Sequence, residues 1–256
     1  MRVTITSSTD TIVLGESWWD GSDGWFLNAD DGLDTDWFGS VAPKALPDTS
    51  VPNADGAFWP SSINLKHRVF PIRGFFLADS STLQAHVARD RVNALAAQAL
   101  EICIEDGAGP RWVTGYLTDP TGTVTRFTED QIDFTLLVTC PDPLKYGEWV
   151  RFPVTGGAAT VEMNGSSTAA TQPLVITTGV TRTLVVADYR GRTFEWAGMA
   201  NGLSIDMSEG IPLDGTGQQV GRLLDAGRIE VPPGRSVLTV QTDAAAATVQ
   251  ARPGWK

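Results

Sequence analysis

The sequence predicts a mainly β protein with one long helix, divided into two domains near the middle of its 256 residues. Short apolar segments recur through the second half at intervals of about 8–12 residues, which is typical of a β-sandwich or barrel. One segment alone, after Ser81, has the apolar period of a helix. Between the halves stand Pro141 and Pro143, which remove two backbone donors and favour extended geometry. We therefore expect domains at 1–147 and 148–256.

The first domain is predicted to be an α+β unit. Its apolar, β-favouring segments predict strands at 2–14 (one or two strands), 66–77, 111–117, 123–127 and 132–140. Pro71 indicates that the second of these is an edge strand or carries a bulge, because proline cannot donate to a ladder.

The helix of the first domain is predicted near 82–104. It is preceded by Ser81-Thr82-Leu83-Gln84, a capping box with Ser at the cap and Gln three residues later. Four-residue steps then place Leu83, Val87, the stem of Arg91, Leu95 and Ala99 on one apolar face, with Val92 and Ala96 beside them. This places Cys103 at the end of the helix.

The second domain is predicted to be a β-sandwich. Its strand candidates are residues 161–163, 174–177, 184–187, 193–196, 203–207, 228–231, 237–242 and 248–252. Turn residues such as Gly191 and Gly234 separate them.

Charge is unevenly distributed. Of the net charge of −11, residues 1–147 carry 10 basic and 20 acidic side chains, and residues 148–256 carry 9 and 10. An acidic surface repels phosphate, so nucleic acid is not expected as a specifically bound partner. No apolar run is long enough to span a membrane, and residues 1–6 alternate rather than forming the apolar core of a secretory signal. Cys103 and Cys140 predict buried thiols of a protein made in a reducing cytoplasm.

Residues that commonly carry catalysis or bind metals are scarce. His67 and His86 are the only histidines, and neither has a second ligand at metal-binding spacing. Neither a Gly-x-Ser-x-Gly elbow nor a phosphate-binding loop occurs, so we expect no enzyme activity and no cofactor. Residues 16–60 contain nine acids and five tryptophans. Oxygen donors at Asn28, Asp30, Asp31, Asp34 and Asp36 leave a metal site open as an alternative to a partner-facing loop, although their spacing does not fit an EF-hand.

The aromatic residues of this loop predict contacts with subunits or partners, because large aromatics dominate buried contacts between proteins. The residues expected there are Trp18, Trp19, Trp25, Trp37 and Phe38. In the second domain, Trp149, Trp196 and Trp255 are expected to serve the core. An alternative is that Trp196 is exposed and stacks on a glycan.

Several motifs, in order, resemble the distal tail proteins of long-tailed, non-contractile bacteriophages. The first is Pro141-Asp142-Pro143-Leu144-Lys145-Tyr146-Gly147, which is similar to the Asp-Pro-x-Lys-Tyr segment that closes the family's first domain. Similar motifs follow in the second domain: Asn164-Gly165, Gln172-Pro173-Leu174-Val175-Ile176, Gly202-Leu203-Ser204-Ile205-Asp206-Met207 and Val231-Pro232-Pro233-Gly234-Arg235-Ser236. The insertion at 16–60, and Arg235 where the family has Asn, depart from the pattern.

The resemblance implies a structural protein of the virion tail tip, assembled in the host bacterial cytoplasm. The first (belt) domain is then expected to form a homo-oligomeric ring, usually of six subunits, and the second to be a galectin-like sandwich. Such a ring joins the tail tube to the tail tip or baseplate, contacts the tape measure protein and lets DNA pass through its lumen without specific binding. A carbohydrate-binding module contacting host cell-wall glycans is the alternative function.

Overall fold

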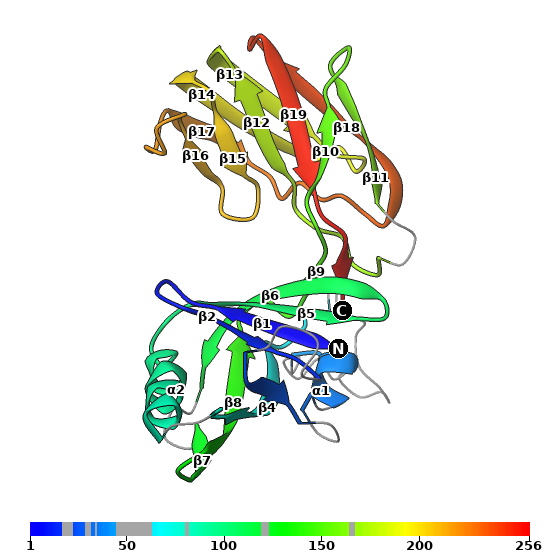
Figure 1. Cartoon of the computed structure of the whole chain (residues 1–256). Helices are drawn as coiled ribbons and strands as arrows, with labels where there is room; N and C mark the ends of the chain where they lie inside the picture. The colour runs from blue at the N-terminus through cyan, green and yellow to red at the C-terminus, as the bar shows by residue number, and fades with distance from the viewer. Residues whose placement is uncertain are drawn as a thin grey trace, which may run out of the picture. The chain divides into compact units, whose positions relative to one another are not determined.

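A computed structural model describes residues 1–16, 23–28, 32–33, 35–44, 63–79, 82–118, 123–163 and 167–256. The chain divides into two compact units (Figure 1). Unit 1 comprises Met1–Lys145 and Lys256, and unit 2 comprises Tyr146–Trp255. The division falls inside the segment of residues 141–147, here called the junction. The chain is mainly β, as predicted.

Unit 1 is an antiparallel sheet that closes on itself. Its strands follow the order β2-β1-β5-β6-β8-β4-β3, and β7 pairs with β8. At the two ends of this order, Gly15 N–H donates to the Trp25 carbonyl (3.2 Å) and Leu27 N–H donates to the Gly15 carbonyl (2.8 Å). The bounds are β1 Arg2–Thr6, β2 Thr11–Leu14, β3 Trp25–Leu27, β4 Arg68–Leu77, β5 Leu100–Asp106, β6 Gly109–Leu117, β7 Val124–Phe127 and β8 Gln131–Cys140.

The core of unit 1 lies inside this closed sheet. Alternate residues of β1, β2, β5 and β8 are buried, as the strand period of two predicts. In β8, for example, Ile132, Phe134, Leu136 and Val138 are buried and the residues between them are less so. Strand β4 pairs with β8 along its whole length and with β3 only at its C-terminal end, so its N-terminal half is partly an edge, as Pro71 indicated.

The long helix, α2 (Thr82–Ala94), is shorter than the predicted 82–104. Residues 100–106 form β5 instead, which pairs with β1 and β6. Leu100, Ile102 and Ile104 alternate with Glu101, Cys103 and Glu105, a period of two that the tertiary ladder uses. Ala97 has a φ of 58°, which ends the helical path before the strand. Cys103 therefore lies within a strand and not at a helix end.

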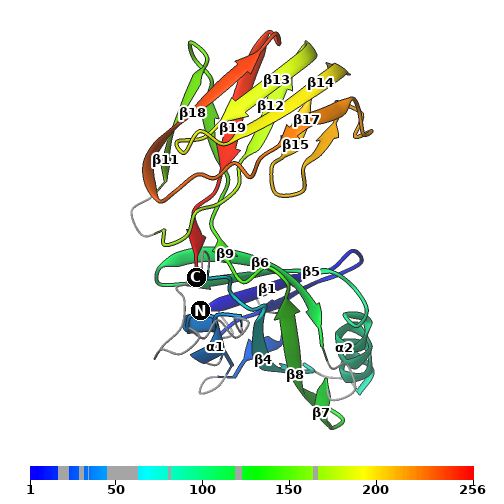
Figure 2. The same cartoon turned by 180° about the vertical axis from the view of Figure 1, so that it is seen from behind.

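The buried face of α2 also differs from the prediction. Ala85, Ala88, Val92 and Leu95 face the core, whereas Leu83 is 71% exposed. The spacing of three, four and three residues is helical, and the two alanines on the packed face let the helix lie close to β8, β7 and β4 (Figure 2). Of the predicted face, Leu95 and the neighbouring Val92 are buried as expected, whereas Leu83 and Val87 are exposed.

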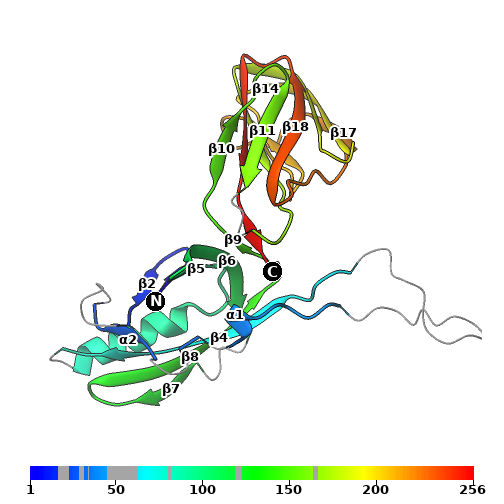
Figure 3. The same cartoon turned by 90° about the vertical axis from the view of Figure 1, so that its right-hand side faces the viewer.

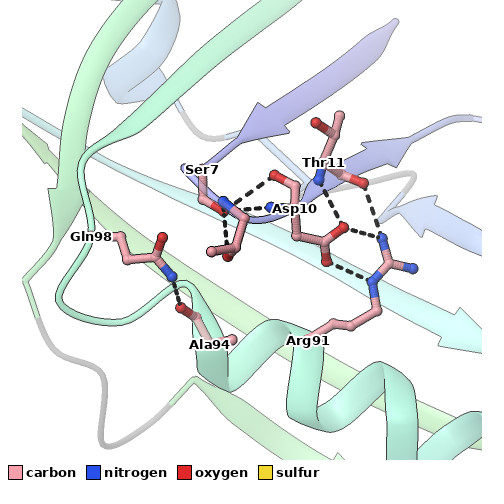
Figure 4. A network of polar contacts seen from close by, with 7 residues as sticks. Ser7, Asp10, Thr11, Arg91, Ala94 and Gln98 are labelled. Carbon is pink, nitrogen blue, oxygen red and sulfur yellow. Dashed lines mark hydrogen bonds and ion pairs between the residues drawn. The ribbon is translucent and has the colours of Figure 1, made fainter.

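A polar network fixes α2 to the turn between β1 and β2 (Figure 4). The Arg91 guanidinium donates through Nε to Asp10 Oδ2 (2.6 Å) and through Nη2 to Asp10 Oδ1 (2.9 Å) and the Thr11 carbonyl (3.0 Å). The hydrogen bond from Arg91 lowers the pKa of Asp10, since it favours the ionised carboxylate. The same guanidinium lies 5.3 Å from the ring centre of Trp25.

Unit 2 is a sandwich of two antiparallel sheets, as predicted. One has the order β10-β19-β12-β15-β16 and the other β11-β18-β13-β14-β17. The bounds are β10 Val150–Pro153, β11 Ala158–Met163, β12 Leu174–Thr178, β13 Val180–Ala187, β14 Thr193–Asn201, β15 Ser204–Asp206, β16 Ile211–Leu213, β17 Arg222–Ala226, β18 Gly234–Thr242 and β19 Ala246–Ala251. The inward residues of both sheets form a core that shares no residue with that of unit 1.

One strand prediction in unit 2 is wrong. Residues 228–231 form no ladder; Val231 makes a single bridge to Thr171, and the edge strand β17 precedes them. Ile229 and Val231 are buried, which explains why their apolar pattern resembles that of a strand.

Candidate functional site

Two exposed segments of unit 1, residues 40–44 and 63–67, lie side by side and are here called the arm. Lys44 N–H donates to the Asn64 carbonyl (2.7 Å), and Lys66 N–H donates to the Ala42 carbonyl (2.9 Å). Figure 3 shows the two segments running together away from the body of unit 1. Within the described residues, neither segment has a strand partner on its outer edge. Such edges are templates for pairing with another chain.

The surface of the arm is apolar and basic. Ile63 in the arm and Phe38 beside its base are each 56% exposed. Lys44, Lys66 and His67 are exposed, and neither arm segment contains an acid. The first half of the chain is otherwise strongly acidic, so the arm is opposite in charge to the unit that carries it.

At the base of the arm lies a buried arginine. The preceding helix, α1 (Thr35–Phe38), leads into one arm segment, and the other leads into β4 at Arg68. Arg68 is 1% exposed. Its Nη1 donates to the carbonyls of Trp37 (3.4 Å) and Gly39 (3.2 Å), and its Nε donates to the carbonyl of Pro143 (3.0 Å). One guanidinium thus joins both ends of the arm to the junction.

A second buried cation, Lys145, approaches the same place. Lys145 belongs to the two-residue strand β9 (Lys145–Tyr146) and is 2% exposed. Nζ donates to the Trp37 carbonyl (3.0 Å) and lies 5.1 Å from the centre of the Trp37 ring. Burial lowers the pKa of Lys145 to about 8; Arg68 and Arg111 lower it further, while Asp106 acts in the opposite direction.

The structure places the predicted contact residues differently from the expectation. Trp37 is buried against Phe70, with ring centres 5.2 Å apart, and Trp25 is buried against Phe76 at 4.9 Å. Both are core residues of unit 1, which corrects their expected place on a partner surface. Phe38 is exposed beside the arm. Trp18 and Trp19 lie outside the described residues.

Three successive contacts of the junction involve Asp142, Pro143 and Lys145. Asp142 Oδ1 accepts the Leu144 N–H (3.0 Å), which closes a tight turn. The next carbonyl, of Pro143, accepts from Arg68, and Lys145 reaches the base of the arm. Sequence reasoning identified this motif but not Arg68, whose only sequence signal is a cation at the start of an apolar strand.

The first residues of unit 2 contact its last residues. The Arg252 guanidinium lies 3.8 Å from the ring centre of Tyr146 and 4.6 Å from that of Trp149. Gly147 N–H donates to the Pro253 carbonyl (2.9 Å), and a Cβ at Gly147 would lie 2.7 Å from Pro253 Cγ. Strand β9 accordingly pairs with the last strand, β20 (Gly254–Trp255).

Trp196 is not available for the alternative glycan site. Trp196 is 1% exposed, and its Nε1 donates to the Val220 carbonyl (2.9 Å), so its ring belongs to the core of the sandwich and cannot stack on a sugar. Unit 2 does contain an open cavity of about 420 Å³, with Phe194, Met207 and Leu223 among its apolar lining and Glu209 and Arg228 among its polar lining. No tryptophan lines this cavity.

Three of the five residues of the alternative metal site, Asp30, Asp31 and Asp34, lie outside the described residues. Within the residues that are described, no group of three or more His, Cys, Asp or Glu side chains is arranged to hold a metal ion. Burial raises the pKa of Cys140 to about 12, so this thiol stays protonated. In the described part of the chain, no helix has the length and apolar character needed to cross a membrane.

Over its whole length, the chain has the fold of solved hub and baseplate proteins of bacteriophages. One is the Dit protein of phage SPP1, described as a paradigm of the hub adsorption apparatus in phages infecting Gram-positive bacteria; its TM-score is 0.64 at 14% identity, with 99% of each chain covered. Chains from the phage P2 baseplate in its activated conformation match with TM-scores of 0.52, at 10% identity with Ca and 11% with Sr. They cover 99% and 100% of this chain and 98% of theirs.

The resemblance inferred from the motifs is thus confirmed at the level of the fold. No protein-family profile and no curated protein sequence matches the chain.

Proposed function

We propose that this chain is a structural protein of a bacteriophage tail tip, where copies of it form a ring that joins the tail tube to the tip or baseplate. The observation that carries the proposal is the match of both units, in order and over 99% of each chain, to the Dit hub protein of phage SPP1. A match confined to the sandwich would support only a common β module.

The arm supplies a mechanism for closing the ring. Its outer edges can pair with a strand of the next copy, while Phe38 and Ile63 bury apolar surface there. The lysines of the arm fit an acidic neighbour, which is what the rest of unit 1 offers. Contacts of this head-to-tail kind generate closed rings when the rotation between copies closes, and six copies is the expected number.

Tail partners follow from the same proposal. The ring contacts the tail tube protein, the tape measure protein and the tip or baseplate proteins, and it is assembled in the host cytoplasm. DNA passes through the lumen without specific binding, because an acidic wall repels phosphate. The role is non-enzymatic, in keeping with the structural character of the hub and baseplate proteins that share the fold.

Negative-stain images and native mass spectra of the purified chain test the proposal. We expect closed rings, with six copies as the main mass, alone or after addition of the tail tube protein. A monomer under all of these conditions contradicts the proposal.

Paired substitutions test the role of the arm. Phe38→Ser with Ile63→Ser removes two exposed apolar side chains, so the variant should remain folded but associate about five- to thirtyfold more weakly at each contact, as expected for a loss of about 1–2 kcal/mol of apolar burial. Leu83→Ser with Met199→Ser is the matched control, since both residues are exposed elsewhere on the chain. Rings that tolerate the first pair as well as the second would show that the arm is not the contact.

A further inference from the structure

We propose that Lys145 is a positioning residue whose side chain fixes the base of the arm, so that the junction sets where the arm leaves unit 1. The inference deepens the proposed function, since it concerns the surface by which copies are proposed to join. It does not require the ring to exist, because every contact that carries it lies within one copy of unit 1.

The arm follows a helix, α1, that is too short to be stable by itself. Helix α1 has four residues, fewer than a helix needs for stability in water. Its position must come from outside contacts, and these converge on Trp37: the ring packs on Phe70, and the carbonyl accepts from both Arg68 and Lys145. Phe38 and Gly39 follow Trp37 and are exposed, and the arm begins at the next residue, Ser40.

Of the two cations, Lys145 makes the shorter contact with this carbonyl, 3.0 Å against 3.4 Å for Arg68. Arg68 is already fixed within the β4–β8 ladder opposite Cys140 and divides its donors among three carbonyls. Lys145 comes from the junction, 108 residues further along the chain from Trp37. It is therefore the contact that ties the position of α1 to the segment entering unit 2.

Burial of the Lys145 ammonium has a cost, which the Trp37 carbonyl and ring offset in part, since burial still lowers the pKa of Lys145. The charged groups that act on it are Arg68 on β4, Arg111 on β6 and Asp106 at the end of β5.

The test is backbone hydrogen exchange on the full chain, measured on its monomeric fraction, with Lys145→Met and the control Lys66→Met. Both variants lose one positive charge, but Lys66 is exposed in the arm. We expect residues 40–44 and 63–67 to exchange about tenfold faster in Lys145→Met, the effect of one lost hydrogen bond from a charged donor, with β8 unchanged. Lys66→Met should exchange as the wild type does.

Arm exchange in Lys145→Met equal to the wild type overturns the inference, as does an equal acceleration throughout unit 1, which would mark a general structural role. If this variant does not fold, Lys145→Leu takes its place in the same comparison, since a smaller apolar side chain also lacks the donor. Arm exchange equal to the wild type in that variant overturns the inference as well. Absence of rings, by contrast, would overturn the proposed function while leaving this result standing.

Discussion

Neighbouring residues of the junction serve different units. Lys145 turns toward the carbonyl end of α1 in unit 1, while the ring of Tyr146 lies under Arg252 in unit 2. Successive side chains of an extended segment point to opposite sides, so an extended Lys-Tyr pair can make both contacts at once. Gly147 follows because Pro253 leaves no room for a side chain there. These contacts explain why Lys, Tyr and Gly follow one another at residues 145–147.

Asp10 gives a prediction at the residue scale. Its pKa is lowered chiefly by the hydrogen bond from Arg91, so the contribution of the pair is present above the unfolded pKa, near 3.9, and is lost as the pH falls through the lower folded value. Asp10→Asn should cost about 1 kcal/mol at pH 7, because the pair is bidentate but partly exposed. Urea unfolding at pH 7, 4 and 3 should show the difference shrinking as acid is added.

Glu101→Gln, at an exposed carboxylate of β5, is the control for this series and should change the free energy of unfolding little at any pH. A constant cost of Asp10→Asn down to pH 3 would mean that the ion pair is not its source.

The sequence does not predict which of the aromatic residues are buried and which are exposed. Trp25, Trp37 and Phe38 stand in the same acidic, glycine-rich context, and composition alone gives no reason to separate them. Trp37 and Phe38 are successive residues of α1, and helix geometry turns one toward Phe70 and the other to solvent. Which of them faces the core depends on where β4 passes, a long-range contact with no local signal.

At the scale of elements, α2 began where its capping box predicted, but its buried face was predicted correctly only at its C-terminal end, at Val92 and Leu95. Leu83 and Val87 suggested an apolar stripe, yet alanines at 85 and 88 face the core. Large side chains would keep the helix away from β8, whereas alanine permits close packing. The strand β8, with buried residues at every second position, was correctly predicted because its own period is unambiguous. Strands β10 and β17 are mostly exposed and have no such pattern.

A matched pair of leucines tests the face of α2. Leu95→Ala, at the buried C-terminal end, should lower the free energy of unfolding by about 2–5 kcal/mol because it leaves a cavity. Leu83→Ala should change it by less than about 0.5 kcal/mol, since the side chain is exposed. Chemical unfolding followed by circular dichroism measures both. If the two substitutions lower the free energy of unfolding by similar amounts, Leu83 is buried as the sequence predicted.

At the scale of the whole molecule, the two cores share no residue, and each unit is long enough to bury its own apolar interior. The division between the units lies between Lys145 and Tyr146, next to the two prolines that interrupt the chain where the strand pattern changes. The closure of the first sheet through Gly15 was not predictable, since it depends on two backbone hydrogen bonds between segments with no distinctive residues.

Separate cores predict two calorimetric transitions. Ile102 in β5 and Ile205 in β15 are both fully buried, one in each core. Ile102→Ala and Ile205→Ala should each destabilise by about 2–5 kcal/mol, and each should lower the midpoint of a different transition. Differential scanning calorimetry of the two variants measures this. A single transition shifted equally by both would show that the units unfold as one.

The chain enters and leaves the sandwich at one place, because Gly147 is hydrogen-bonded to Pro253 and β9 pairs with β20. A module with adjacent ends can be spliced out, enlarged or swapped for another without stretching the scaffold that carries it. The barrel-like unit, its arm and Lys145 all precede the splice point. Exchange of residues 146–255 therefore gives the same first unit a different sandwich in a single step.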